Sequence, residues 1–481
     1  MDLSQKKGQL IFMDQTFTHE DFRSDVISFS KQLSNYGLKH GDRVILRCSN
    51  TYSFCVSLFS LMHIDCSIVL LDIETKESDT NKILLKTNAK WLLAEEDFEN
   101  QIGYKHIKIS TIMKESLYKK TFYKNEPICL DSWFNRSDAV ILFSSGSTGI
   151  PKGMVKSGSS LFNNMHSTAI GMRYRKDDVI LPIVPFFNIW GFNLIIQWWV
   201  VGCTLVICNY RTTRTISSLI EKNKVSVVEA TIATTYLTLQ LIDRKLENKS
   251  KICKSLRMWY TSGAPVPQTL KNRFHEVINL PLLDYYGSSE AGNLTATNLQ
   301  STNGTGKLLP GSSVKVFNEK FEELGFGEVG HVYAKGNGLM EGYLIENNKI
   351  ELSLKNGWFD MKDFGFFDEE GNLFILGRRD NAIHRMGATF FPCHMERLVE
   401  ELGVMSKVVS FPDDKKGSHL ILFVQSPQDN SAFIRKKVLE VVPTYMYPDE
   451  FFCLNEFPFL PNGKVDNKQL ESIVNKNYSL V

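Results

Sequence analysis

The first 300 or so residues alternate between helix-like and strand-like hydrophobic patterns. Apolar residues recur at helical spacing in residues 22–36, and a turn cluster separates that segment from the short apolar run at 43–46. Helical spacing returns in residues 52–63, which lead into the continuous apolar run at 67–71. Strands that alternate with helices in this way are typical of parallel sheets with helices on their faces.

The pattern changes after residue 310. Between 310 and 376, glycines separate short alternating runs such as 314–317 and 331–334, which predicts a small antiparallel or barrel-like subdomain. After Gly377–Asp380 comes a segment of about 100 residues with helix and strand signals of its own. The predicted fold class is therefore α/β: a large N-terminal domain of helix-covered sheets with the barrel-like subdomain (1–376), then an α+β C-terminal domain (381–481) beyond a hinge at 377–380.

Residues 190–208, WGFNLIIQWWVVGCTLVIC, form the most apolar window of the chain. The window is about long enough to span a bilayer. It contains Asn193, Gln197 and Gly202, however, and no basic residues flank it. A buried helix followed by a strand is the favoured interpretation, and a membrane span is the alternative.

Charge and cysteine content exclude several classes. The chain has 55 Lys+Arg and 53 Asp+Glu among 481 residues, so its net charge of +2 does not favour a nucleic-acid partner. No signal-peptide pattern follows the N-terminal lysines. The nine cysteines are scattered and form no CxxC pair, which predicts a reducing, cytoplasmic location and no disulfide framework.

A glycine-rich loop follows a predicted buried strand. Residues 139–153 read AVILFSSGSTGIPKG, in which glycines allow several backbone N–H groups to turn inward as an anion-binding nest. The hydroxyl groups add neutral donors, and Lys152 adds a point charge suited to phosphate. The Walker A spacing is not met, because Pro151 stands where that motif needs glycine. The loop therefore indicates a phosphate site of another kind, with a flexible surface loop as the alternative.

The segment SSGSTGIPKG closely resembles the phosphate loop of the adenylate-forming superfamily. That superfamily includes acyl-CoA synthetases, aryl-acid ligases, peptide-synthetase adenylation domains and firefly luciferase. Other segments are similar to the family's motifs in the same order along the chain: Phe17-Thr18 with GDRV at 41–44, TSGAP at 261–265, DYYGSSE at 284–290, GWFDMKD at 357–363, GRRD at 377–380, PTYMYP at 443–448 and LPNGKVD at 460–466. The resemblance thus extends from end to end.

The resemblance implies a nucleotide site. Lys152 and the loop would hold the β- and γ-phosphates of ATP; the loop residues are Ser144, Ser145, Gly146, Ser147, Thr148 and Gly149. Glu290 would hold Mg²⁺, and Ser289 would hydrogen-bond the α-phosphate. The residues implied to contact adenosine are Gly263, Ala264, Asp284, Tyr285, Tyr286, Gly287, Asp363 and Arg378. Among them, Tyr286 would stack on adenine, Asp284 would accept from the adenine amino group, and Asp363 with Arg378 would bind the ribose.

The resemblance implies that two residues of the C-terminal part act in the movement of that domain. Lys464 would bring its ammonium group to the substrate carboxylate and the α-phosphate when a mobile C-terminal domain closes. Asp380 would be the hinge residue. The alternatives are a solvated surface lysine and an ordinary turn aspartate.

Candidate residues of the acid pocket also follow from the resemblance; they are Asn188, Trp190, Tyr236, Gly263, Tyr285, Gly287, Ala291 and Gly292. Asn188 replaces a frequent histidine, which suits a polar aryl acid or a neutral gate residue. Trp190 and Tyr236 would shorten the pocket for a planar or medium-length acid, or would simply be core aromatics. The position where amino-acid-activating members carry an aspartate falls on Asn188 or Ile189, which disfavours an α-amino acid.

Four other positions depart from the family pattern. Met361 and Lys362 replace threonine and glycine before Asp363, and His384 and Thr389 replace frequent basic residues. The resemblance implies an AMP-forming acid–thiol ligase. It would use ATP and Mg²⁺ to activate an aryl or short to medium acyl acid and would transfer it to coenzyme A or a phosphopantetheinyl carrier protein. The alternative is a degenerate nucleotide-binding member with a regulatory or scaffolding role.

Overall fold

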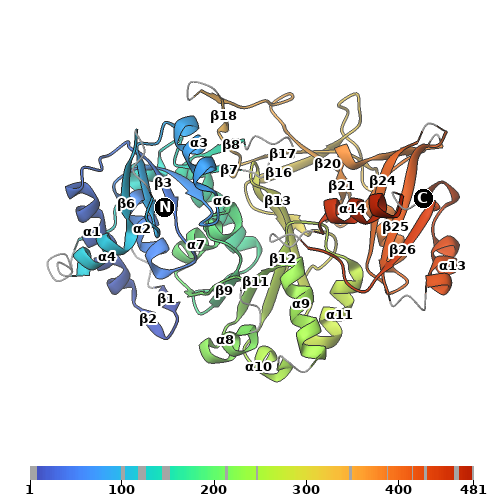
Figure 1. Ribbon diagram of the computed structural model, residues 1–481, viewed down its shortest axis with the longest axis horizontal. Helices are drawn as coiled ribbons and strands as arrows, with labels where there is room; N and C mark the ends of the chain where they lie inside the picture. The colour runs from blue at the N-terminus through green and yellow to red at the C-terminus, as the bar shows by residue number, and fades with distance from the viewer. Residues whose placement is uncertain are drawn as a thin grey trace.

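The computed structural model describes most of the chain. The described residues are 8–98, 103–117, 126–143, 152–211, 215–244, 248–345, 349–386, 388–413, 415–426, 431–459 and 465–478. Figure 1 shows them as an elongated molecule with the C-terminal segment, orange to red, at one end.

The larger of two mixed sheets has nine strands within the described residues, in the order β15-β14-β13-β12-β11-β9-β10-β1-β2. These strands are β1 (Gln9–Phe12), β2 (Gln15–Phe17), β9 (Val179–Ile183), β10 (Thr204–Ile207), β11 (Val227–Thr231), β12 (Met258–Ser262), β13 (Leu282–Ser288), β14 (Gly292–Ala296) and β15 (Lys307–Leu308). The run from β1 through β10, β9, β11 and β12 to β13 is parallel.

The second mixed sheet has the order β19-β18-β8-β7-β4-β3-β5-β6. Its strands are β3 (Arg43–Arg47), β4 (Ser67–Leu71), β5 (Trp91–Ala94), β6 (Lys105–Lys108), β7 (Val140–Phe143), β8 (Gly153–Lys156), β18 (Gly342–Leu344) and β19 (Ile350–Glu351). The strands from β6 to β7 are parallel. The predicted parallel sheets are therefore confirmed.

A third sheet accounts for most of the predicted subdomain. It is antiparallel with the order β16-β17-β20-β21, formed by β16 (Ser312–Phe317), β17 (Gly330–Gly336), β20 (Phe359–Phe367) and β21 (Leu373–Arg378). The segment 342–351 departs from the prediction of one compact unit over 310–376, because β18 pairs with β8 of the second sheet.

Helices cover the sheets, as Figure 1 shows. Those before the C-terminal segment are α1 (His19–Asn35), α2 (Tyr52–His63), α3 (Glu77–Thr87), α4 (Ile109–Leu117), α5 (Asp131–Phe134), α6 (Gly158–Gly171), α7 (Ile189–Val201), α8 (Ile216–Asn223), α9 (Ile232–Asp243), α10 (Lys249–Cys253) and α11 (Gln268–Ile278). Helix α1 begins at a capping box in which Thr18 and Asp21 satisfy each other's backbone N–H groups. Helix α7 ends at Gly202, whose φ of 74° is the left-handed conformation that glycine adopts without strain.

Helix α7 and strand β10 account for the apolar window at 190–208. Residues of α7 are buried almost throughout, and β10 follows directly. The helix-then-strand interpretation is confirmed. In the ranges that the structure describes, no helix combines the length and apolar content that a membrane crossing needs.

The C-terminal segment contains a short ribbon, a three-stranded sheet and three helices within the described residues. Its elements are β22 (Ile383–Arg385), β23 (Ala388–Phe390), α12 (Pro392–Glu400), β24 (Ser406–Asp413), β25 (Gly417–Gln425), α13 (Ser431–Val441), β26 (Glu450–Leu454) and α14 (Asn467–Tyr478). One 3₁₀ turn (Arg379–Asn381) links it to β21, and another (Thr444–Met446) precedes β26.

Its apolar side chains form two clusters of their own. One centres on Met395, Leu420 and Leu422, the other on Phe423 and Leu470, and all members lie between residues 383 and 474. A separate core is what an independent domain needs. The division into 1–376 and 381–481 stays a prediction that these separate cores support.

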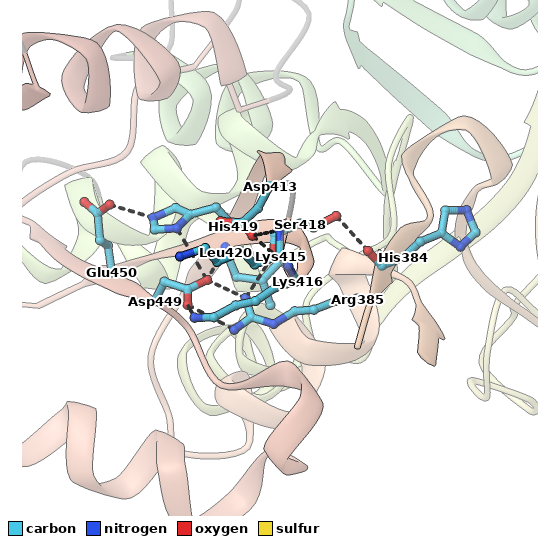
Figure 2. A network of polar contacts seen from close by, with 10 residues as sticks. All are labelled: His384, Arg385, Asp413, Lys415, Lys416, Ser418, His419, Leu420, Asp449 and Glu450. Carbon is cyan, nitrogen blue, oxygen red and sulfur yellow. Dashed lines mark hydrogen bonds and ion pairs between the residues drawn. The ribbon is translucent and has the colours of Figure 1, made fainter. Parts of the chain in front are cut away.

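A network of charged side chains also belongs to the C-terminal segment (Figure 2). Asp449 accepts from both terminal nitrogens of Arg385, from Lys416 at 2.6 Å and from the backbone N–H of Leu420 at 2.8 Å. The Arg385 side chain is only 4% exposed. These bonds tie β22 to the β25–β26 edge.

Candidate active site

Most candidate residues lie at one edge of the nine-stranded sheet. Strands β9, β11, β12 and β13 are parallel neighbours, so their carboxyl ends meet at the same edge. Asn188 follows β9, Gly263 and Ala264 follow β12, and residues 284–290 form and follow the end of β13. Ligands of open parallel sheets bind beyond this edge.

The predicted adenosine residues Tyr286, Asp363 and Arg378 meet there. The Tyr286 hydroxyl donates to Asp363 Oδ2 at 2.5 Å, and Arg378 Nε lies 3.4 Å from Asp363 Oδ1. The Asp363 carboxylate is buried, while the Arg378 side chain is 54% exposed. Burial raises the pKa of the Tyr286 hydroxyl, so it stays a donor. The cluster presents an aromatic face, an acceptor and a cation at one place.

Two glycines lie near this cluster, one required by a close contact and the other favoured by its backbone conformation. A Cβ on Gly287 would lie 2.2 Å from the Gly292 carbonyl oxygen, so the turn that carries Ser289 and Glu290 closes only with glycine there. Gly263 has a φ of +96°, and a Cβ built on it meets no atom within 4 Å. The space beside Gly263, where the resemblance implies that adenine binds, is therefore open, and the backbone conformation there favours glycine.

Asp284 lies in β13 and is fully buried. Burial raises the pKa of its carboxyl to about 7, and Lys271 opposes this shift. Its backbone N–H donates to Thr297 Oγ1 at 2.7 Å. Near neutral pH this carboxyl therefore exists in both forms, so its implied role as an acceptor for the adenine amino group stays a prediction.

The residues implied to meet phosphate and magnesium are brought together by Tyr343. Its hydroxyl donates to Glu290 Oε1 at 2.8 Å, and the Lys152 ammonium lies 5.5 Å from the centre of its ring. A carboxylate oxygen is the ligand type that Mg²⁺ prefers, so Glu290 fits the ion it is implied to hold. Residues Ser144, Ser145, Gly146, Ser147, Thr148 and Gly149 lie outside the described residues.

Lys156 anchors the backbone of the Glu290 turn. Its side chain is fully buried, and its Nζ donates to the Gly338 carbonyl and, at 3.4 Å, to the Glu290 carbonyl. Burial lowers the pKa of Lys156 to about 8. Lys156 is therefore a positioning residue for Glu290.

We expect Lys156→Met to lower the free energy of unfolding by about 2 kcal/mol, because the buried Gly338 carbonyl loses its donor and the Glu290 carbonyl keeps only the Met340 N–H. The variant should also raise the KM for Mg-ATP. Denaturant unfolding and steady-state kinetics measure the two effects. Lys176→Met, at an exposed position, is the control and should change stability by less than about 0.5 kcal/mol. Equal effects of both substitutions would contradict the assignment.

On the opposite face of β13, Tyr285 and Trp190 meet a carboxylate that the sequence analysis did not select. Trp190 Nε1 donates to Glu229 Oε2 at 3.1 Å, and the hydroxyls of Tyr174 and Tyr285 also donate to Glu229. Glu229 lies in β11 and is 1% exposed. Two of the predicted acid-pocket residues are thus joined by a buried acid.

The remaining pocket candidates have other neighbours. Asn188 Oδ1 accepts from the Gly191 N–H at 2.9 Å, so this side chain caps α7. Tyr236 lines a cavity of about 240 Å³ that α9 and α11 share with Phe459 of the C-terminal segment. Ala291 packs into the core beneath the third sheet. A Cβ on Gly292 would lie 2.7 Å from Asn164. Their assignment to the acid pocket stays a prediction.

The hinge region is tied to the third sheet. Asp380 is exposed in the 3₁₀ turn, and its neighbour Arg379 donates to Asp360 Oδ2 at 2.8 Å. Lys362 has a φ of 58°, which explains why glycine suits this position in the family pattern. Met361 is a core residue of the third sheet.

Lys464 lies outside the described residues, but the base of its segment is visible. Phe459 and Val465 form an isolated antiparallel bridge, and Phe459 lines the cavity beside Ile232, the first residue after β11. An ion pair of 3.2 Å between Arg244 and Glu456 crosses the same boundary. The described residues before this segment thus contact α9 and α11 of the N-terminal part.

Sequence reasoning missed Glu229, Tyr174, Lys156 and Tyr343. The signal for Glu229 and Lys156 was a single charge inside an apolar strand, because an ionisable residue is seldom buried without a partner. Tyr174 and Tyr343 gave no signal, since each is an isolated tyrosine far in sequence from its partner.

Comparison with known proteins identifies the family. The family model described as AMP-binding enzyme matches residues 4–344, which is well over half of the 481 residues. The chain is similar to the 2-succinylbenzoate–CoA ligase of Bacillus licheniformis, with 26% identity and coverage of 91% of each protein. It is also similar to the enzyme of that name from Bacillus subtilis, with 24% identity over 98% of this chain and 96% of the relative.

Solved structures share the fold. ATP-bound MatB from Rhodopseudomonas palustris has a TM-score of 0.84 at 18% identity and covers 99% of this chain and 97% of its own. The o-succinylbenzoate CoA synthetase (MenE) of Bacillus subtilis, in complex with the acyl-adenylate intermediate OSB-AMP, has a TM-score of 0.79 at 21% identity. The matched part is 97% of this chain and 95% of that one. The predicted fold class and the predicted family are confirmed.

Proposed function

We propose, because this chain belongs to the AMP-binding enzyme family, that it is an AMP-forming acid–thiol ligase. A carboxylate oxygen of the acid attacks the α-phosphorus of ATP, and the bond to pyrophosphate breaks. The thiol of coenzyme A then attacks the acyl carbon, and AMP leaves with the electron pair of the acyl–oxygen bond. The substrate is an aryl or short to medium acyl acid.

One observation carries the proposal: β13 presents the two halves of such a site on its two faces. Tyr286 points to Asp363, while Tyr285 points to Glu229. Adjacent residues of a strand face opposite sides, so the nucleotide side and the acid side are one residue apart at the carboxyl edge of the sheet. Adenylation needs this proximity, because the acid's carboxylate must reach the α-phosphate.

The residues of the chain divide the work. Asp363 accepts from the ribose hydroxyls, and Arg378 adds a donor. Lys152 stabilises negative charge on the phosphates together with the loop 144–149, and Lys464 acts in the same way on the α-phosphate. Glu290 holds Mg²⁺, which when bound neutralises phosphate charge. Asp380 belongs to the hinge between the domains 1–376 and 381–481.

The names of the relatives inform the choice of thiol acceptor and of carboxylic acid substrate. Those compared above are named CoA ligases, which favours coenzyme A over a carrier protein as the acceptor. Their names also place 2-succinylbenzoate among the acids to be tested. We further infer a cytoplasmic location, which the nine free cysteines support.

ATP–pyrophosphate exchange over a panel of carboxylic acids, followed by mass spectrometry of products with coenzyme A, tests the proposal. Exchange with at least one acid and formation of its CoA thioester are the expected results. Nucleotide binding without exchange across the panel would contradict the proposal and favour the degenerate alternative.

A further inference from the structure

Glu229 is a buried carboxylate to which the proposed reaction assigns no role. It lies in the middle of β11, is 1% exposed, and accepts from Tyr174, Trp190 and Tyr285. These partners are neutral hydroxyl and indole donors; Arg257, which lies near Tyr174 and Tyr260, is paired with Asp178. A buried carboxylate is costly without such bonds, so the network is built around it.

The strand register aims this carboxylate at the acid side of the site. Glu229 pairs with Pro182 of β9 and Tyr260 of β12, and Tyr260 pairs with Leu283 of β13. Register partners share a face, and Tyr285 is two residues beyond Leu283, so Glu229 and Tyr285 lie on the same face. The position is thus fixed by three strands.

The two aromatic residues held by Glu229 form one wall. The rings of Trp190 and Tyr285 are 5.9 Å apart, edge to face at 87°, and the rings of Tyr260 and Tyr285 are 6.2 Å apart. Trp190 and Tyr285 are the acid-pocket candidates that the structure unites, so an acid bound in the proposed pocket would place its far end against this wall. The charge behind the wall then acts on whatever group the acid carries there.

A second carboxylate on the substrate would face Glu229 in a medium of low dielectric constant. Like charges are repelled more strongly there than in water, and the side chains that bond Glu229 are neutral, while Arg257 beyond Tyr174 and Tyr260 is already paired with Asp178. The carboxylate to be activated would avoid this cost, because it would lie at the nucleotide side with Lys152 and with Glu290, which would hold the magnesium ion.

We propose that Glu229 is a specificity-determining residue that restricts the enzyme to acids with a single carboxylate and a neutral aromatic or short acyl body. This inference rests on the proposed function and deepens it. As a consequence, this enzyme would prefer monocarboxylic acids, whereas the relatives are named for 2-succinylbenzoate, a dicarboxylic acid.

The test compares two acids that differ only in the second carboxylate. 3-Benzoylpropanoate and 2-succinylbenzoate share the acyl chain and ring, and the latter adds a ring carboxylate. We expect kcat/KM for pyrophosphate exchange to favour 3-benzoylpropanoate by about 10-fold in the wild type at pH 8, where most of the Glu229 side chains are ionised. Glu229→Gln keeps the size and an acceptor oxygen while removing the charge, and it should reduce this ratio by about 10-fold.

The pH dependence of the ratio separates charge from shape. Burial raises the pKa of Glu229 to about 7, and the titratable groups that face it, Tyr174, Tyr260 and Tyr285, have pKa values raised far above neutrality. The wild-type ratio should therefore increase between about pH 6 and pH 8, and the ratio of the Gln variant should not.

The outcomes distinguish the two proposals. If no acid in the panel supports exchange, the proposed function fails. If monocarboxylates are activated but 2-succinylbenzoate is used equally well at every pH, the inference about Glu229 is overturned. If the Gln variant does not fold, the wild-type ratio and its pH dependence decide the question alone.

Discussion

Replacing Lys464 by alanine is expected to reduce ATP–pyrophosphate exchange by about 10²–10³-fold, because one preorganised cation is lost from the transition state. The bridge between Phe459 and Val465 holds the base of its segment beside Ile232, at the end of β11. Ile232 follows the carboxyl end of β11, the sheet edge beyond which the candidate residues lie. Exchange rates at saturating ATP and acid measure the effect.

Lys468→Ala is the matched control for this experiment. Lys468 is an exposed residue of α14 four positions further on, and its replacement should leave exchange within about twofold of the wild type. Nucleotide binding by the Lys464 variant should persist, since adenosine is held by Tyr286, Asp363 and Arg378. Exchange at the wild-type rate in Lys464→Ala would refute the assignment.

The sequence was most informative where one physical pattern dominates. The helical spacing in 52–63 and the apolar run at 67–71 correspond to α2 and β4. Burial of one or both faces of a segment requires apolar residues at regular positions, and this pattern is visible in the sequence. The prediction placed 342–351 within the subdomain, but β18 pairs with β8 and with β19. These two strands have only three and two residues, and so short a sequence does not specify its pairing partner.

The site shows the same division. Tyr286, Asp363 and Arg378 could be predicted to lie together because each belongs to a motif. The role of Asn188 was harder to predict, because a helix cap and a pocket residue have the same local sequence. Tyr236, predicted to line the acid pocket because of its size, lines a different cavity. Glu229, which the sequence analysis did not select, accepts a hydrogen bond from Trp190 instead.

The largest expected effect on stability concerns the network around Asp449 (Figure 2). Arg385 is almost completely buried, and Asp449 is its carboxylate partner, with Lys416 and the Leu420 N–H adding to the same carboxylate. Desolvation opposes ionisation of Asp449, but the hydrogen bonds from Arg385 and Lys416 prevail and hold the pKa of its carboxyl well below the usual range. Removing that charge leaves a buried guanidinium without compensation.

We expect Asp449→Asn to lower the free energy of unfolding of the C-terminal segment by about 3–5 kcal/mol at neutral pH. Lys416→Met, which removes a partner that is 47% exposed, should cost at most about 1 kcal/mol. Because the folded pKa of Asp449 lies below the unfolded value of about 3.9, its contribution is present above that pH and is lost as the pH falls through the lower folded value. The difference between wild type and Asp449→Asn should therefore shrink on acidification below about pH 4. Hydrogen exchange of the β25 amides in denaturant measures it, and a difference that grows in acid would show that Asp449 is not the charge that stabilises Arg385.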